Sequence, residues 1–454
     1  MLTLHDRLYG EINIPDRARR LASDCPVILR LREVRMPNVG FVTFPSFASV
    51  TRFEHSVGVS HLAWWWARRN DLEQDTAEAL AIAGLYHDAA TPAFSHLYEE
   101  FLQRDGFDHE QELYNLLTGK TNLLGSERAQ VFLGRGCLLP QVLPEPTSSE
   151  SQLTLSGIAE TVTGSTALGE VLHGQIDLDN IDNVIRAVTA MGLVTQRETI
   201  HPYEVANALV YEDGRVCVAP DGLAAIANWQ RLRRRLYSAI NENEMEFRTQ
   251  ATIKWAISKC AEEDEEIRSS QSWRMSEPEL IEKIRKYDLP KRLIDQVRLN
   301  SPGRLLLSAW FSDISTLLGP GSEKMLDSIA YEIGSQVGED VYVNFYIDKR
   351  ERRINLPRSS RLVLFDDDSL LDQPWQQLDC TGRQPGIVGV ISLPARMSRG
   401  SGEEPHDGPT AKRHLDLAQA GRVLASYVGV NPDAISTRWV GSRRGSGSHQ
   451  EPLF

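Results

Sequence analysis

The spacing of apolar residues predicts helices over most of the chain. From about Arg52 to Met191, apolar positions recur at the three- and four-residue spacing of amphipathic helices, and a second such stretch runs from about Asp221 to Leu318. Loops are expected at Thr118–Gly125 and Leu138–Glu150. Residues 1–50 predict short strand and turn elements, followed by a helix around Pro26–Arg35.

The pattern changes after Gly319-Pro320, where β-branched and aromatic residues become frequent. Three segments there read as strands: Val341–Ile347, Arg361–Phe365 and Gly386–Leu393. A loop or linker at Ser398–Pro409 precedes a predicted helix near Lys412–Val428, and the tail Gly441–Phe454 is expected to be disordered. The sequence therefore predicts a mainly α fold with a smaller mixed α/β region at its C-terminal end.

Composition narrows the class of protein. The chain has 454 residues, 62 acidic and 49 basic, so its formal net charge is −13, which argues against a protein that mainly coats nucleic acid or anionic membrane. No window reaches the roughly 18 apolar residues that a membrane helix needs. The five cysteines are scattered without a C-x-x-C pair, which favours neither a disulfide framework nor a thiolate zinc site. We expect a reduced, cytoplasmic protein without membrane contact.

Histidines are concentrated in one part of the sequence. Five of the eleven lie between positions 55 and 109: His55, His61, His87, His96 and His109. His55 follows Arg52 at the start of an apolar helix. The next helix begins near Asp75, with Asp75 and Glu78 at the spacing of an N-terminal cap. His87 falls on the apolar face of that helix and Asp88 at its end.

A third polar segment, QIDLDNIDNVIRAV, repeats polar residues on one helical face, at Asp179, Asp182, Asn183 and Arg186. An adjacent His-Asp pair, joined by a histidine and an aspartate from other helices, forms a mixed nitrogen and oxygen ligand set. Such a set suits Mn, Fe, Mg or Zn and leaves coordination positions for water and phosphate oxygens. These residues predict a divalent-metal site suited to hydrolysis of phosphate esters.

The longer motifs carry a family resemblance. RFEHSVGVSHLA, AGLYHDAATPAFSHLYEE, HEQ at His109 and GQIDLDNIDNVIRAVTAMGL resemble, in this order, the HD-domain dNTP triphosphohydrolases. The opening LHDRLYGEINIP is also similar to the first segment of that family. The resemblance implies an HD-domain metal phosphohydrolase core at residues 1–195 and a helical continuation at 196–320. A small α/β region at 321–440 and a tail at 441–454 would follow.

The resemblance also implies roles for individual residues. The expected metal ligands are His55, His87, Asp88 and Asp179, with Asp177 supporting the start of its helix. Arg52 resembles an arginine that holds a phosphate. His96 and Glu99 resemble a proton-carrying histidine and its carboxylate partner, and His109 resembles a third catalytic residue in the same pocket. We expect His61 to be a core residue.

Several substrate positions depart from the family pattern. Thr91 stands where relatives carry His or Asn, and Asn183 replaces a tyrosine, although both are still expected to contact substrate. A lysine or arginine after the I-D-x-D element is replaced by Asn180, and Met36-Pro37 replaces a sugar-reading Gln-Leu pair. Arg32, Arg35, Arg186 or Arg231–Arg235 are candidate replacements for the missing cations.

The function favoured by the sequence is metal-dependent hydrolysis of (deoxy)nucleoside triphosphates to nucleoside and triphosphate. One alternative keeps the metal site but takes another phosphate ester, such as a nucleic-acid end, a cyclic nucleotide or a modified nucleotide. The other is a nucleotide-sensing module with weak catalysis. The expected partners are a nucleotide substrate and further copies of the chain in a homo-oligomer, and single-stranded nucleic acid is a further candidate ligand.

Overall fold

The computed structural model describes residues 3–117, 142–143, 153–317, 322–347, 386–393, 422–424 and 426–427, apart from positions 41, 104–105, 175, 196–197, 199 and 312. These residues divide into two compact units, the first reaching Asn300 and the second starting at Ser301. The first unit is built mainly from helices, and the second combines helix and sheet. The mainly α fold with a mixed C-terminal region is thereby confirmed.

The first unit opens with a small antiparallel hairpin, β1 (His5–Asp6) and β2 (Gly10–Glu11). Short helical elements follow: α1 (Asp16–Asp24), α2 (Pro26–Arg30), η1 (Leu31–Glu33) and α3 (Pro45–Ala48). The helix expected around Pro26–Arg35 is therefore present as α2 and η1, whereas α1 was missed. The backbone of Arg35 then forms an isolated antiparallel bridge with Thr51, directly before the next helix.

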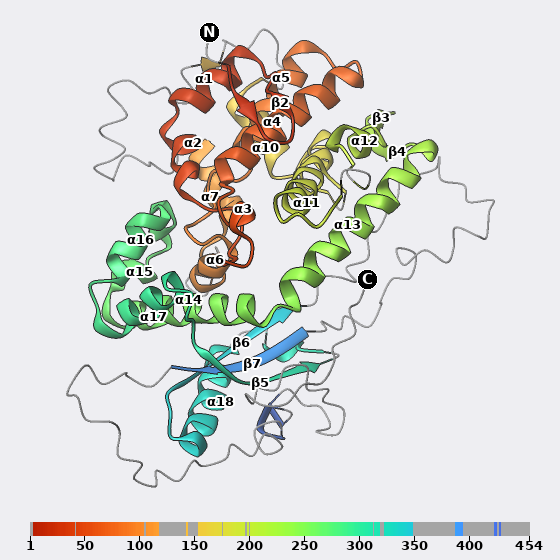
Figure 1. Cartoon of the computed structure of the whole chain (residues 1–454). Helices are drawn as coiled ribbons and strands as arrows, with labels where there is room; N and C mark the ends of the chain where they lie inside the picture. Colours follow the sequence, from red (N-terminus) through yellow and green to blue (C-terminus); the bar gives the residue numbers. More distant parts are fainter. Residues whose placement is uncertain are drawn as a thin grey trace. The chain divides into compact units, whose positions relative to one another are not determined.

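Three helices form the centre of this unit: α4 (Arg52–Arg69), α5 (Gln74–Tyr86) and α11 (Leu178–Ala190). The Thr51 hydroxyl caps α4 by accepting the backbone N–H of Glu54. Helices α4 and α5 pack directly against each other, and α11 packs on α4 (Figure 1). Because α5 is buried on every side from Ala77 onward, its residues from Ala79 to Tyr86 are apolar all round rather than amphipathic.

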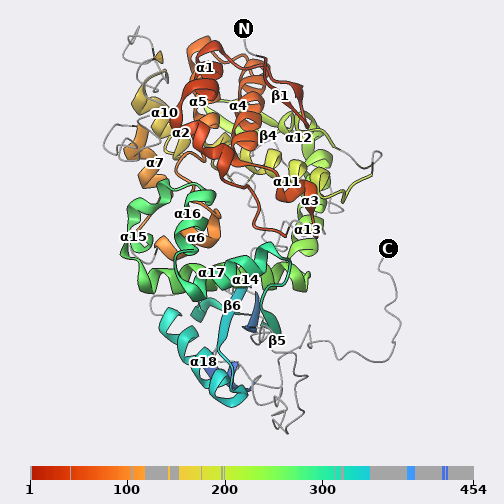
Figure 2. The ribbon, with the colours of Figure 1, turned by 60° about the vertical axis from the view of Figure 1, so that its left-hand side comes forward.

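The first unit contains further helices outside this centre (Figure 2). They are α6 (His96–Leu102), α7 (His109–Leu117), α10 (Leu155–Val162), η4 (Leu168–Val171), α12 (Pro202–Ala206), η5 (Pro220–Gly222), α13 (Leu223–Asn241), α14 (Glu244–Glu263), α15 (Glu265–Arg268), η6 (Ser270–Arg274), α16 (Glu277–Ile284) and α17 (Asp288–Arg298). Among these helices, α14 packs on α17 and on α6. Helix α13 packs on α11 of the central group.

A hairpin interrupts the stretch expected to continue as helix after residue 195. Strands β3 (Leu209–Glu212) and β4 (Arg215–Val218) pair through the two-residue turn Asp213-Gly214. Both turn residues have positive φ, 49° and 75°, as a type I′ turn requires. An Asp-Gly pair between two apolar runs is a strong hairpin signal that the helical reading overlooked.

The second unit contains a three-stranded antiparallel sheet in the order β5-β7-β6. Its strands are β5 (Arg304–Phe311), β6 (Val341–Ile347) and β7 (Gly386–Ser392). Helix α18 (Ser322–Val337) contacts β6 and supplies Ile329 and Ile333 to the core beneath the sheet. A short turn, η7 (Ser315–Leu317), precedes α18.

The expected strands at Val341–Ile347 and Gly386–Leu393 are confirmed, whereas the helical stretch was extended too far. Arg304–Phe311 is a strand, because its continuous apolar run is buried in a sheet and carries no helical periodicity. The first unit accordingly ends at Asn300, before the boundary expected at residue 320.

One expected helix cap is absent, and several expected elements lie outside the described residues. Helix α5 begins at Gln74 with Glu73 as its N-cap, so Asp75 lies inside the first turn and not at the expected cap position. The Glu78 carboxylate pairs with Arg17 at 2.7 Å. The expected loops at 118–125 and 138–150, the strand at 361–365, the linker at 398–409, most of the helix at 412–428 and the tail lie outside the described residues, apart from positions 142–143. Within the described part of the chain, no helix has the length and apolarity needed to cross a membrane.

The close packing of α4 on α5 generates a stability prediction. A Cβ at Gly84 would lie 3.2 Å from the carbonyl oxygen of Val59 and 3.3 Å from Cα of Ser60, both backbone atoms of α4. We expect Gly84→Ala to lower the free energy of unfolding by about 1–3 kcal/mol, because the helices must separate slightly. Denaturant unfolding measures this change. A gain of about 1 kcal/mol, which alanine gives at an unconstrained helix position, would contradict it.

Candidate metal centre

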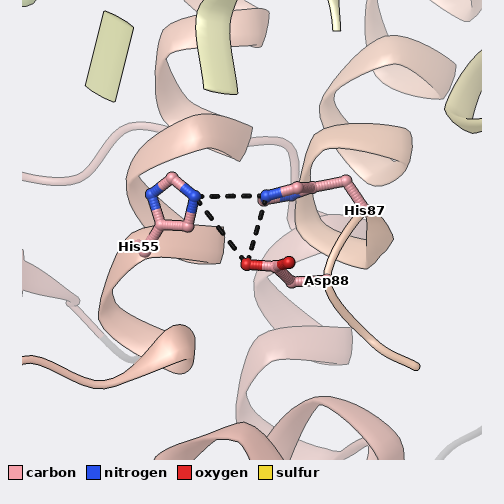
Figure 3. A group of neighbouring side chains, drawn as sticks. All are labelled: His55, His87 and Asp88. Atoms are coloured by element: carbon pink, nitrogen blue, oxygen red, sulfur yellow. Dashed lines mark hydrogen bonds and ion pairs between the residues drawn. The ribbon is translucent and has the colours of Figure 1, made fainter. Parts of the chain in front are cut away.

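The candidate centre is assembled from the start of one helix and the end of another. His55 lies in the first turn of α4 and is completely buried, while His87 and Asp88 follow the last residue of α5. Since α4 and α5 pack side by side, the beginning of α4 meets the end of α5. Figure 3 shows the three side chains pointing toward one another.

The ligand atoms are closely spaced. Nε2 of His55 lies 3.2 Å from Nε2 of His87 and 3.8 Å from Oδ2 of Asp88, and Nε2 of His87 lies 3.4 Å from Oδ2 of Asp88. Asp179, in the first turn of α11, places Oδ1 2.8 Å from Nε2 of His55 and 3.5 Å from Nε2 of His87. Three separate segments of the sequence therefore bring two imidazoles and two carboxylates together.

This spacing fits a divalent metal. Ligand atoms about 2.1 Å from a metal lie roughly 3.0 Å apart at right angles and about 3.4 Å apart at tetrahedral angles. The five distances above, from 2.8 to 3.8 Å, scatter around these values. His55, His87 and Asp88 could hold a metal ion, and two nitrogens with carboxylate oxygen suit Mn, Fe or Zn.

The second nitrogen of each histidine is also occupied. Nδ1 of His87 donates to the carbonyl oxygen of Gly84 at 2.8 Å, and Nδ1 of His55 donates to Oδ1 of Asp182 at 2.7 Å. A neutral imidazole with its proton on Nδ1 has a lone pair on Nε2. Both Nε2 atoms face the centre, so these hydrogen bonds favour the tautomer that a metal ligand needs.

Asp88 is held in place from both of its oxygens. Arg52 donates from Nη1 to Oδ2 at 2.8 Å, and the Thr91 hydroxyl donates to Oδ1 at 2.9 Å. Thr91 is buried, and its carbonyl oxygen accepts a hydrogen bond from Arg30 at 2.6 Å. The structure thus gives Thr91 the task of orienting Asp88, while its expected contact with substrate stays a prediction.

Asp177 fixes the start of α11 and thereby the position of Asp179. Its carboxylate accepts the backbone N–H of Asn180 at 2.6 Å and that of Gly174 at 3.0 Å. This is the N-terminal cap that the sequence suggested. Asn183 is partly exposed one turn after Asp179, and it takes no part in the hydrogen-bond network of the described residues around the centre.

The charges at the centre are strongly coupled. Burial by itself raises the pKa of the Asp88 carboxyl, but the positive charges of Arg52 and His87 hold that pKa well below its usual value. Burial likewise lowers the pKa of His87, while the carboxylates of Asp88 and Asp179 raise it well above the ordinary histidine value. Without a metal, protonated imidazole thus supplies the positive charge that these carboxylates require.

Glu99 joins two further histidines in a second cluster beside the first. Its Oε2 accepts from Nδ1 of His96 at 2.8 Å, and its Oε1 accepts from Nδ1 of His109 at 2.5 Å. The His96 side chain is 66% exposed, whereas that of Glu99 is 6% exposed. The structure therefore brings together all three residues for which a catalytic role was expected.

The backbone before His96 is strained. Phe94 and Ser95 have φ angles of 53° and 46°, a region that costs about 1–3 kcal/mol for residues other than glycine. Side-chain contacts hold this conformation: Asn38 donates to the Phe94 carbonyl oxygen at 2.6 Å, and the Ser95 hydroxyl donates to the Arg35 carbonyl oxygen at 3.0 Å. Ser95 also accepts from Nε of Arg52 at 3.2 Å, which links this turn to the metal centre.

Sequence reasoning missed the importance of Asp182 and placed His61 correctly. Asp182 was assigned to a polar helix face, but it is completely buried and contacts His55 directly. Its three-residue spacing from Asp179 was the available signal. His61 is buried, with Nδ1 against the backbone of Asn13 and Nε2 against the Tyr203 hydroxyl, in keeping with the expected core role.

Comparisons with known proteins agree with this geometry. The HD domain model matches residues 52–133. The deoxynucleoside triphosphate triphosphohydrolase SAMHD1 homolog of Dictyostelium discoideum is 33% identical over 25% of this chain and 24% of its own length. SAMHD1 of Homo sapiens is 33% identical over 22% of this chain and 17% of its own length. The chain therefore spans about a quarter or less of these relatives.

Solved structures extend the likeness in fold to most of the chain. A hypothetical protein from Aquifex aeolicus has a TM-score of 0.57 at 18% identity, covering 86% of this chain and 96% of its own. A phosphohydrolase from Bacteroides thetaiotaomicron has a TM-score of 0.60 at 16% identity, covering 87% of this chain and 100% of its own. Residues 52–133 therefore match the HD domain, and part of the chain is similar in sequence to deoxynucleoside triphosphate triphosphohydrolases.

Proposed function

We propose that this protein is a metal-dependent phosphohydrolase that cleaves nucleoside triphosphates, with release of nucleoside and triphosphate. The observation that carries the proposal is the grouping of His55, His87 and Asp88 at metal-ligand spacing, with Asp179 close to both histidines. The partial similarity of the chain to triphosphohydrolases supports the choice of substrate class.

In this proposal the four residues hold one divalent metal, with Nε2 of each histidine and one oxygen of each aspartate facing it. Such a metal lowers the pKa of a bound water and neutralises negative charge that develops on phosphate. His55 and His87 keep their Nε2 lone pairs available through their Nδ1 hydrogen bonds. Asp88 keeps its orientation through Arg52 and Thr91.

Arg52 also serves the substrate in this proposal. Its Nε and Nη1 are engaged by Ser95 and Asp88, while Nη2 makes no hydrogen bond to any residue that the structure describes. A guanidinium held from one side presents its remaining N–H groups in a fixed direction, which suits a phosphate oxygen. Arg52 would thus contact both Asp88 and the scissile phosphate.

His96, Glu99 and His109 would handle protons. Glu99 occupies the Nδ1 side of both imidazoles, so each histidine has Nε2 left to accept or donate a proton. Burial lowers the pKa of His109, but the hydrogen bond and negative charge of Glu99 raise it above the ordinary value. His109 is therefore suited to donate a proton to a leaving oxygen near neutral pH.

A second candidate substrate is another phosphate ester with fewer charges, such as a nucleic-acid end or a cyclic nucleotide. Two arginines that were candidates for binding the triphosphate already form ion pairs with carboxylates of the protein. Arg186 is buried against Asp182 and Asp6, and Arg35 pairs with Glu277 at 2.6 Å. Arg32 is exposed and stays a candidate. Cytoplasmic location, homo-oligomer formation and binding of single-stranded nucleic acid stay predictions.

Removal of either carboxylate tests the metal assignment. We expect Asp88→Ala and Asp179→Ala to lose bound metal and to reduce hydrolysis by more than about 100-fold, because changes outside the ligand sphere already cost roughly 10–100-fold. Metal content by elemental analysis and phosphate release measure the two effects. Asp16→Ala is the control, since that side chain is 79% exposed on α1. Full metal occupancy in both variants would contradict the assignment.

A substrate panel tests the reaction. The wild-type protein, loaded with Mn²⁺, is offered dNTPs, NTPs, cyclic nucleotides and short oligonucleotides, and the released phosphate species are identified. We expect triphosphate from a nucleoside triphosphate. Cleavage confined to oligonucleotides or cyclic nucleotides would select the second candidate, and nucleotide binding without turnover would select a sensing module.

The Glu99 cluster gives a pH-dependent prediction. Burial raises the pKa of Glu99, but its hydrogen bonds from His109 and His96 lower it well below the usual value. The lowered pKa of Glu99 stabilises the fold above the ordinary glutamate pKa, and this stabilisation is lost as the pH falls. The raised pKa of His109 stabilises the fold below the ordinary histidine pKa, and this stabilisation is lost as the pH rises. We expect Glu99→Gln to lower the free energy of unfolding by about 1 kcal/mol. This loss should be largest between roughly pH 4.3 and 6.5, where wild-type Glu99 is charged and His109 is protonated. Unfolding midpoints measured from pH 3 to 9 check this, and a pH-independent loss would contradict it.

A further inference from the structure

We propose that the turn joining β1 to β2 positions the metal-binding face of His55 through a buried relay of hydrogen bonds. In this relay, Asp6 holds Arg186. Arg186 and Tyr9 both donate to Asp182, and Asp182 accepts from Nδ1 of His55. This inference rests on the proposed function, because it takes His55 as a metal ligand. It assigns positioning roles to residues that lie far from His55 in the sequence.

Asp182 is the centre of the relay. Its side chain is completely buried, and its two oxygens accept four hydrogen bonds. Oδ1 accepts from Nδ1 of His55 at 2.7 Å and from Nε of Arg186 at 2.8 Å. Oδ2 accepts from Nη2 of Arg186 at 2.9 Å and from the Tyr9 hydroxyl at 2.8 Å. With both oxygens held in this way, the carboxylate has no freedom to rotate away from His55.

Arg186 connects the Asp182 carboxylate to the turn between β1 and β2, here called the N-terminal turn. Its side chain is also completely buried, and Nη1 donates to Oδ2 of Asp6 at 2.7 Å and to Oε1 of Glu54 at 3.2 Å. The other oxygen of Asp6 accepts the backbone N–H groups of Leu8 and Tyr9 at 2.7 and 3.2 Å. Asp6 therefore fixes both the conformation of the turn and the direction of the guanidinium group.

Tyr9 acts as a donor toward Asp182. Burial and the negative charge of Asp182 raise the pKa of its phenol well above the usual value, so the hydroxyl keeps its proton. The ring packs edge-on against His61 and His201, with centroids at 5.0 and 5.8 Å, and lies 5.7 Å from the ring of Tyr203. These ring contacts hold the phenol of Tyr9 in place.

The sequence of α4 leaves room for the relay. A Cβ at Gly58, one turn after His55, would lie 2.7 Å from Oδ2 of Asp182 and closer still to Nη2 of Arg186. Only glycine allows both groups to lie against the helix that carries His55. The relay is thus built into three separate segments: the N-terminal turn, α4 and α11.

The consequence concerns metal affinity. A carboxylate that accepts the Nδ1 proton of a ligating histidine sets the tautomer and direction of the ring and makes it a better donor, and loss of such a partner commonly weakens metal binding by about 10–100-fold. Tyr9 and Arg186 act one step further away, by holding Asp182. Changes at Tyr9 should therefore alter metal binding although Tyr9 does not touch any expected ligand.

Two tyrosines of the same cluster provide a matched test. Tyr9→Phe removes the hydrogen bond to Asp182 and keeps the ring, whereas Tyr203→Phe removes a hydrogen bond to His61 that does not involve Asp182. Calorimetric titration of the full-length, metal-free variants with Mn²⁺ should show about 10-fold weaker binding for Tyr9→Phe and less than about 2-fold change for Tyr203→Phe. Thermal unfolding checks that both variants fold.

Asp182→Asn and His55→Ala complete the design. Asp182→Asn is expected to weaken Mn²⁺ binding more than Tyr9→Phe, and His55→Ala to abolish it. Wild-type affinity in Tyr9→Phe, or equal weakening in Tyr203→Phe, would overturn the relay while leaving the metal site intact. If His55→Ala binds Mn²⁺ like the wild type, the proposed function fails as well, and the two failures are thereby distinguished.

Discussion

The structure depends on balancing the charges of two carboxylates and two imidazoles. These groups meet where α4, α5 and α11 come together, with contacts of 3.8 Å or less between imidazole nitrogens and carboxylate oxygens. Negative charges gathered at one point are unfavourable unless positive charge compensates them. Arg52 and protonated histidine supply part of that charge, and a divalent metal would supply it more completely. The requirement explains why each carboxylate here is engaged by several partners.

The surrounding residues hold these four groups in place through hydrogen bonds to the atoms that do not face the centre. Gly84 accepts from His87, Asp182 accepts from His55, and Thr91 donates to Asp88. Helix packing sets the distances, because the start of α4 must lie beside the end of α5. The hydrogen-bond partners then set the directions. Beside this centre, the strained turn before α6 carries His96 toward solvent, where a substrate can reach it.

The sequence predicted the four central residues because short motifs carry them, and it predicted the helical class from apolar periodicity. It did not distinguish a buried polar face from an exposed one. Asp182 and Arg186 have the spacing of an ordinary solvated helix face, yet both are fully buried because each neutralises the other. Likewise, the apolar run Arg304–Phe311 lacks alternation, so its sequence alone did not separate a buried strand from a helix.

We propose that His55, His87, Asp88 and Asp179 share one metal ion. The most direct measurement is anomalous X-ray diffraction from crystals of the protein grown with Mn²⁺, recorded on either side of the manganese absorption edge. We expect a single strong anomalous peak about 2.1–2.3 Å from Nε2 of both histidines and from one oxygen of each aspartate. A fully ordered centre without anomalous signal, or a peak bound by other residues, would contradict it.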